Sequence, residues 1–107
     1  AFSPDGQRLV TSGGSGPLKL WDVSTGDAAA GFNGPALDGL GVAFSPDGTK
    51  IAVGTFDNLV VVVDASTGAI KAKHTKHERV VTGVAWSPDG KRLYSSSMDM
   101  TVRSWPG

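Results

Sequence analysis

Ala43-Phe44-Ser45-Pro46-Asp47-Gly48 stands near the middle of this 107-residue chain, and the same six residues open it as Ala1-Phe2-Ser3-Pro4-Asp5-Gly6. A third version, Ala85-Trp86-Ser87-Pro88-Asp89-Gly90, follows, so the motif begins at residues 1, 43 and 85 and recurs every 42 residues. With the same spacing, Asp22-Val23-Ser24-Thr25-Gly26 recurs as Asp64-Ala65-Ser66-Thr67-Gly68. Two unrelated motifs that keep one register indicate a repeat protein.

Each period consists of four short strand-like runs separated by turn residues, and no segment has helical periodicity. In the second period we expect strands at residues 40–44, 50–55, 59–64 and 69–74. Ser-Pro-Asp-Gly predicts a turn because Pro presets φ, Asp bonds its own backbone and Gly accepts a positive φ. The run Val60-Val61-Val62-Val63 is apolar on both faces and should be covered on both sides, whereas the polar fourth run reads as an edge. Four antiparallel strands that run from buried to exposed describe one propeller blade.

The composition restricts the kinds of partner. Ten basic and ten acidic residues cancel, so no basic excess is available for nucleic acid or an anionic membrane surface. No run approaches the roughly 18 apolar residues of a membrane-spanning helix. Cysteine is absent, which excludes disulfides and thiolate metal sites and suits a reducing compartment. We therefore expect no nucleic-acid or membrane partner and a cytoplasmic or cytoskeletal location.

The period, the Ser-Pro-Asp-Gly turns and Trp21-Asp22 at the end of a third strand resemble the WD40 family, most strongly in residues 93–105. The resemblance covers essentially the whole chain. It implies an all-β fold of antiparallel four-stranded blades, an incomplete portion of a WD40 β-propeller, in copies 1–42, 43–84 and 85–107. The chain would hold the end of one blade's first strand with that blade's remaining strands, one full blade, and three strands of a third. Because both ends fall inside the pattern, we expect a fragment of a larger propeller.

The resemblance also implies a buried hydrogen-bond network of His, hydroxyl, Asp and Trp. In the third copy its members are His77, Ser95 (with Ser97 as an alternative), Asp99 and Trp105. The indole N–H would donate to the hydroxyl, the hydroxyl to His, and the other His nitrogen to Asp. The other copies are incomplete: the equivalent positions hold Thr11, Ser15 and Trp21 in the first, and Val53, Asp57 and Val63 in the second, where Asn33-Gly34-Pro35 replaces the His.

Three other chemistries are compatible with isolated parts of the sequence. A Ser-His-Asp set could serve a hydrolase, but a nucleophile needs an exposed oxygen, and this pattern places the hydroxyl under Trp105. His74 and His77 lack a further His or Cys to complete a metal site. Gly13-Gly14-Ser15-Gly16 resembles a phosphate loop only superficially, because no helix follows it. We expect no catalysis, no metal and no cofactor.

Partner binding is the remaining possibility. The residues Lys71, Lys73, His74, Lys76, His77, Glu78 and Arg79 form a basic cluster that is either a solvated surface or a contact for an acidic segment. In the family, the loops before the first strand and between the second and third strands gather on one face, where partners often dock. Phe, Met and Arg make good interface anchors. The candidates are residues 36–39, Phe56, Asn58, Glu78, Arg79, Met98 and Met100.

The sequence thus favours a non-catalytic protein–protein interaction scaffold, part of a larger WD40 propeller protein or multiprotein assembly. Its partners would be other proteins and the remaining blades, in the same or a neighbouring chain. One alternative is a catalytic or ligand-binding propeller, which the small apolar innermost strands at 40–43 and 82–85 disfavour. The other is a self-assembling fragment. Terminal blades without neighbours should show uncovered apolar faces, and we expect Leu18, Leu20, Val102 and Trp105 there.

Overall fold

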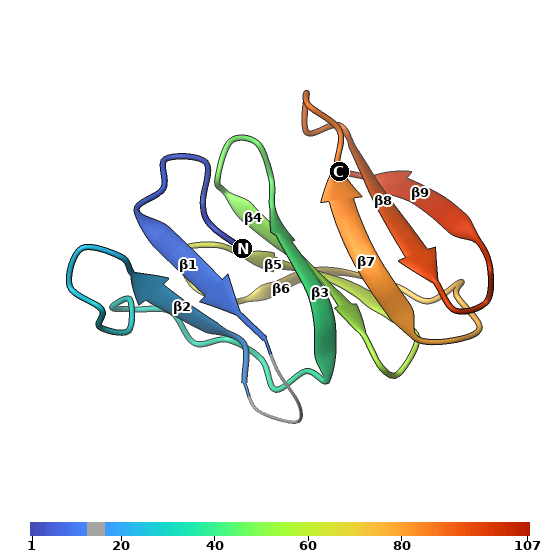
Figure 1. Ribbon diagram of the computed structural model, residues 1–107, viewed down its shortest axis with the longest axis horizontal. Coiled ribbons are helices and arrows are strands. Elements are labelled where there is room, and N and C mark those ends of the chain that lie inside the picture. Colours follow the sequence, from blue (N-terminus) through green and yellow to red (C-terminus); the bar gives the residue numbers. More distant parts are fainter. Residues whose placement is uncertain (13–16) are drawn as a thin grey trace.

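Nine β-strands, without a helix, make up the part of the chain that the computed structural model describes, residues 1–12 and 17–107 (Figure 1). All paired strands are antiparallel. The all-β fold and the open, incomplete propeller are therefore confirmed. The first sheet contains β1 (Arg8–Thr11) and β2 (Lys19–Asp22); the middle sheet contains β3 (Gly39–Phe44), β4 (Lys50–Thr55), β5 (Val60–Asp64) and β6 (Ile70–His74); the third contains β7 (Val81–Trp86), β8 (Arg92–Ser97) and β9 (Val102–Pro106).

The middle sheet is the complete four-stranded blade, in the order β3-β4-β5-β6. Strand β4 has the predicted bounds, and the other three differ from the prediction only by one residue at their starts. Val60, Val61 and Val63 have no exposed surface and Val62 has 4%. The prediction that this strand is covered on both faces is confirmed.

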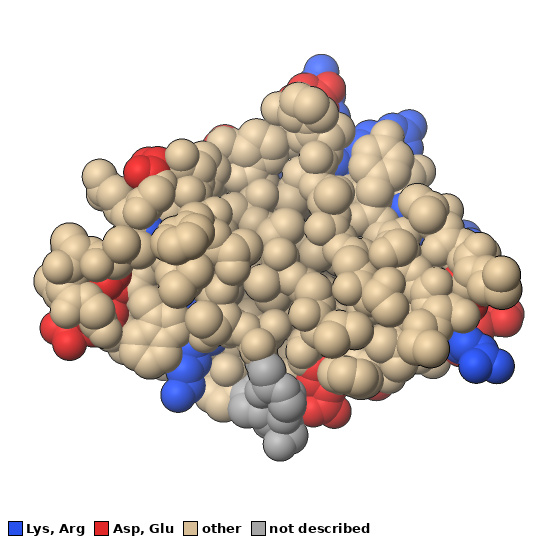
Figure 2. Space-filling view, in the orientation of Figure 1, with Lys and Arg blue, Asp and Glu red and all other residues tan. Residues whose placement is uncertain are grey.

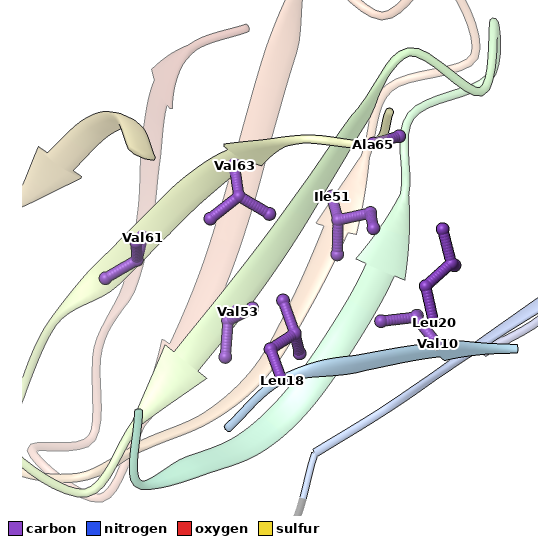
Figure 3. Packing of buried hydrophobic residues seen from close by; sticks show 8 residues of the cluster. All are labelled: Val10, Leu18, Leu20, Ile51, Val53, Val61, Val63 and Ala65. Atoms are coloured by element: carbon purple, nitrogen blue, oxygen red, sulfur yellow. The ribbon is translucent and has the colours of Figure 1, made fainter. Parts of the chain in front are cut away.

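The core consists of two layers, one on each face of the middle sheet. Side chains alternate between the faces of a strand, so Ile51, Val53, Val61 and Val63 point toward the first sheet and pack with Val10, Leu18 and Leu20 (Figure 3). Ala52, Val60 and Val62 point the other way. They pack against Val81, Leu93 and Trp105 of the third sheet. The same sheet-on-sheet contact is thus used twice, once per 42-residue step.

One prediction about the terminal blades was wrong. Leu18 and Leu20 are only 2% exposed and Trp105 only 7%, because all three face inward onto the middle sheet. Only Val102, with 72% of its surface exposed, lies on an outer face. The error arose because a strand has two faces and the sequence pattern alone did not say which one points outward. The apolar residues that are exposed on the outer faces are Phe2, Val23, Tyr94 and Val102.

The first sheet also has fewer strands than expected. Its fourth strand is reduced to an isolated bridge between Trp21 and Ala28, and its innermost strand to a bridge between Phe2 and Leu9. Residues 27–31 contain Asp, three Ala and Gly, which are poor strand formers. Gly31 also has a φ of 79°, which is incompatible with a continuous strand.

The Ser-Pro-Asp-Gly turns adopt the conformation that their sequence predicts. Gly48 has a φ of 74°, and the turn is closed by a hydrogen bond from Gly48 N to Ser45 O of 2.9 Å. The Ser45 hydroxyl donates to Asp47 Oδ1 at 2.7 Å and accepts from Lys50 N at 3.0 Å. Together with the Thr49 amide and hydroxyl, Ser45 lowers the pKa of Asp47 to about 2. The aspartate therefore serves the turn itself.

Candidate functional site

The structure brings His77, Ser95, Asp99 and Trp105 into one chain of hydrogen bonds. Trp105 Nε1 donates to Ser95 Oγ at 2.9 Å, and Ser95 Oγ lies 2.6 Å from His77 Nε2. On the other side of the imidazole ring, His77 Nδ1 lies 3.0 Å from Asp99 Oδ2. An indole only donates and a carboxylate only accepts, so the directions follow from the ends of the chain. The Ser95 hydroxyl donates to Nε2, and the Nδ1–H of His77 donates to Asp99.

These four side chains come from two strands and two loops. Ser95 lies on β8 and Trp105 on the paired strand β9, while Asp99 is in the β8–β9 loop and His77 in the β6–β7 loop. His77 precedes the innermost strand β7, so the network connects the loop that enters the blade with the second and third strands. His77 is therefore linked to residues 18 and 22 positions further along the sequence.

Thr101 belongs to the same cluster and was missed by sequence reasoning. Its hydroxyl donates to Asp99 Oδ1, its amide donates to the same oxygen at 2.9 Å, and the hydroxyl lies 3.3 Å from His77 Nδ1. The Thr101 hydroxyl, with the Glu78 amide and the His77 ring, holds the pKa of Asp99 well below its usual range. The sequence did contain a signal for this contact: a threonine two residues after a loop aspartate donates its hydroxyl to that aspartate, as Thr49 does to Asp47.

Ser97, the alternative hydroxyl, has a different role. Its Oγ donates to Arg79 O at 3.1 Å and accepts from Asp99 N at 3.1 Å. It therefore fastens the β6–β7 loop to the β8–β9 loop without touching Trp105.

The network is closed to a substrate. The His77 side chain has no exposed surface, Ser95 is 2% exposed, and Trp105 covers the hydroxyl. His74 of the middle sheet stacks on the other face of the cluster, with its ring 4.7 Å from that of Trp105 at an angle of 13°. A catalytic serine would need an exposed oxygen and an oxyanion pocket. This arrangement suits a structural connection between two blades.

The other two copies hold only parts of such a network. In the first, Trp21 Nε1 donates to the exposed Thr11 Oγ1 at 3.0 Å, and Ser15 lies outside the described residues, as does the whole Gly13-Gly14-Ser15-Gly16 segment. In the second, Val53 and Val63 are in the core, and Asp57 accepts from the buried Thr55 hydroxyl instead.

The two histidines do not form a metal pair. His77 is engaged with Ser95 and Asp99, while His74 stacks flat on Trp105, and burial there lowers its pKa. Within residues 1–12 and 17–107, no group of three or more potential metal ligands is present. In the same residues, no helix is long and apolar enough to cross a membrane.

The predicted contact residues gather at one end of the sheets, which we call the loop face: residues 36–38, 56–59, 75–80 and 98–101 (Figure 1). Phe56 is 50% exposed, Met98 62% and Met100 95%. Glu78 and Arg79 are also exposed, and Asn58 is half-buried. Figure 2 shows a largely uncharged surface over the middle of the molecule, with charged groups toward its edges.

Hydrogen bonds from main-chain amides join these loops in two pairs, 36–38 with 56–59 and 75–80 with 98–101. Phe56 N donates to Asp38 O at 2.8 Å, Met98 N donates to Val80 O at 3.0 Å, and Glu78 N donates to Asp99 Oδ2 at 3.0 Å. Each pair of loops is therefore held together by main-chain amides and the half-buried Asp99 carboxylate, and the side chains of Phe56, Met98 and Met100 take no part in these bonds.

Comparison with known proteins agrees with this architecture. Residues 1–22, 33–64 and 68–106 match the family model described as "WD domain, G-beta repeat". These stretches make up most of the chain, so the protein belongs to the WD40-repeat family. The crystal structure of the computationally designed Ika4 protein superposes with a TM-score of 0.80 over 94% of this chain, at 24% sequence identity. This chain spans 60% of that protein's length, and the likeness shows the fold alone. No curated protein matches the sequence.

Proposed function

We propose that the chain acts as a non-catalytic scaffold that presents its loop face to a partner protein. WD40 propellers are in general interaction scaffolds. Copies 1–42, 43–84 and 85–107 would then be part of a larger cytoplasmic propeller, with further blades from the same or a neighbouring chain. The observation that carries the proposal is the group of exposed Phe56, Met98 and Met100 on loops that the fold itself holds rigid.

Met100 is the clearest sign of a role beyond folding. It has a φ of 69°, a left-handed conformation that Asn and Gly adopt more easily than Met. The equivalent position in the second copy is Asn58, with a φ of 72°. Met100 therefore stands where the repeat would favour Asn, and the residue is 95% exposed to water. A partner that covers the thioether would offset both costs.

The charges beside these side chains indicate the chemistry of the partner. Lys76 and Arg79 are exposed on either side of Glu78 on the β6–β7 loop, next to the β8–β9 loop that carries Met98 and Met100. The exposed carboxylates of Asp38 and Asp57 lie near Phe56 instead. A partner with an apolar anchor over the two methionines and acidic groups facing Lys76 and Arg79 would match this side of the loop face, because rim charges steer association while buried apolar groups supply affinity.

Site-specific photo-crosslinking in the whole protein, within its own cells, tests the proposal. A crosslinking side chain at Met98 should capture a defined partner, and the substitution Met100→Ser should reduce that adduct. The matched control is a crosslinker at Thr49, exposed in a turn at the opposite end of the middle sheet. Equal capture at both positions, or none at Met98, would contradict the proposal.

A further inference from the structure

The dipeptide Asn33-Gly34 lies in the connection between β2 and β3, outside any strand. Asn33 is exposed, and its side chain makes no hydrogen bond within residues 1–12 or 17–107. It borders a cavity of about 280 Å³ that Lys19 and Phe32 also line. The carboxamide is therefore exposed to water and has no hydrogen-bond partner in the described part of the chain.

The amide nitrogen of Gly34 is equally unengaged in the described part of the chain. The groups on either side of it are held: Asn33 N donates to Thr67 O at 3.0 Å, and Pro35 O accepts from Leu18 N at 2.9 Å. Gly34 has no side chain to block the approach of the Asn33 carboxamide to this nitrogen. An exposed carboxamide is thus placed next to a main-chain nitrogen that lies against the backbone of Gly68 and makes no hydrogen bond in the described part of the chain.

We infer that Asn33 is a site of spontaneous covalent modification, deamidation through a cyclic imide. Hydroxide removes the Gly34 N–H proton, and the nitrogen bonds to Asn33 Cγ. The Cγ–Nδ2 bond of Asn33 then breaks. Nδ2 takes up a proton and departs as ammonia, which leaves a succinimide ring. Water then opens the ring at either carbonyl, which yields aspartate or isoaspartate. The sum is one water consumed and one ammonia released, with no oxidant or reductant.

The isoaspartate product would disturb the contact between the first and middle sheets. It adds a methylene group to the main chain between the two anchoring hydrogen bonds, and the space there is already filled. A Cβ built on Gly34 would collide with the Leu18 carbonyl oxygen, and one on Gly68 would collide with the Asn33 carbonyl oxygen. Leu18 is a buried member of the core. The modification therefore loosens β2 from the middle sheet.

The fold protects the comparable dipeptides. Asn58 is followed by Leu59, whose amide nitrogen donates to Thr55 Oγ1 at 3.0 Å and is covered by a branched side chain. In the three Ser-Pro-Asp-Gly turns the glycine nitrogen donates to the carbonyl oxygen of the Ser at 2.9 Å. Asn58 is thus an internal control.

Peptide mass spectrometry of the intact folded protein, aged in mildly alkaline buffer, tests the inference. The peptide with Asn33 should gain the mass difference between an amide and an acid, at a rate proportional to hydroxide concentration, while the peptide with Asn58 keeps its mass. Electron-transfer fragmentation should identify isoaspartate at residue 33. The substitution Asn33→Gln, which forms its cyclic imide far more slowly, should remove the mass change and the accompanying fall in melting temperature.

Two results would overturn the inference. One is an unchanged Asn33 peptide in the folded protein, whether or not the urea-unfolded chain converts. The other is conversion at Asn58 that equals or exceeds conversion at Asn33. Gly34→Ala is unsuitable as a variant because its methyl group would collide with Leu18.

Discussion

The imidazole ring of His74 lies flat on the indole of Trp105, with ring centres 4.7 Å apart and planes inclined by 13°. His74 belongs to β6 of the middle sheet and Trp105 to β9 of the third, so the stack joins two blades. The same indole also donates a hydrogen bond to Ser95, and it makes a T-shaped ring contact with His77. One tryptophan therefore serves both the network of its own blade and the contact with the next.

Replacing Trp105 with Phe should lower the free energy of unfolding by about 1–3 kcal/mol, because the buried Ser95 hydroxyl loses the hydrogen bond that the indole N–H donates to it. Urea unfolding of the whole protein measures the change. Trp21→Phe is the control: its N–H donates to an exposed threonine that water can satisfy, so its cost should be smaller. Unchanged stability of Trp105→Phe, together with the loss of a hydrolytic activity, would show that the network is catalytic.

The His74–Trp105 stack should make the fold sensitive to mild acid. Burial lowers the pKa of His74 below its ordinary 6.5, so the unfolded chain binds this proton more readily than the folded one. The stability contribution is complete above pH 6.5 and decreases as the pH falls below it. Melting temperatures across this range should show a decline for the wild type that is smaller in His74→Phe, which keeps the ring but cannot titrate. Identical pH profiles would exclude His74 as the source.

The Asp64 turn should contribute to stability only while its carboxylate is charged. The Ser66 hydroxyl and amide, with the Thr67 amide, lower the pKa of Asp64 from 3.8 to about 2. The contribution is therefore complete above pH 3.8 and is lost as the pH falls toward 2. In a carboxyl NMR titration, Ser66→Ala should raise the pKa of Asp64 toward its ordinary value. A pKa that stays low in this variant would assign the shift to the backbone amides alone.

Alanine substitutions on the loop face should separate binding from folding. At least one of Phe56→Ala, Arg79→Ala, Met98→Ala and Met100→Ala should weaken partner binding by more than about 1 kcal/mol, because few residues supply most of the affinity of an interface. The melting temperature should not fall, since these side chains are exposed. Lys91→Ala, at the opposite end, is the control. Unchanged binding by all four variants would place the partner elsewhere.

The chain expressed alone should associate through its outer faces. Phe2 and Val102 are 63% and 72% exposed on opposite outer faces, next to sheets that lack strands. We expect aggregates or oligomers in sedimentation experiments, with slow amide exchange confined to the middle sheet. The double substitution Phe2→Ser and Val102→Thr should reduce the association. A discrete oligomer would favour self-assembly into a ring, whereas a monodisperse monomer with uniformly slow exchange would contradict the expected fragment behaviour.

The repeat, its 42-residue spacing and the strand order were readable from the amino-acid sequence because turn chemistry and alternation are local properties. Pro, Asp and Gly act on neighbouring backbone, and the double-sided apolar run Val60–Val63 required cover on both faces. The four residues that the resemblance grouped, His77, Ser95, Asp99 and Trp105, do meet in the structure.

Only the tertiary structure decided which face of each strand is covered. Leu18 and Leu20 are buried and Val102 is exposed because the first and third sheets each have the middle sheet on one face and no sheet on the other. The alternation of residues along a strand defines its two faces, but it does not say which face another sheet covers. The same holds for the His74–Trp105 stack and for the contact of the Asn33-Gly34 peptide with Gly68. Each depends on how segments distant in the sequence approach one another.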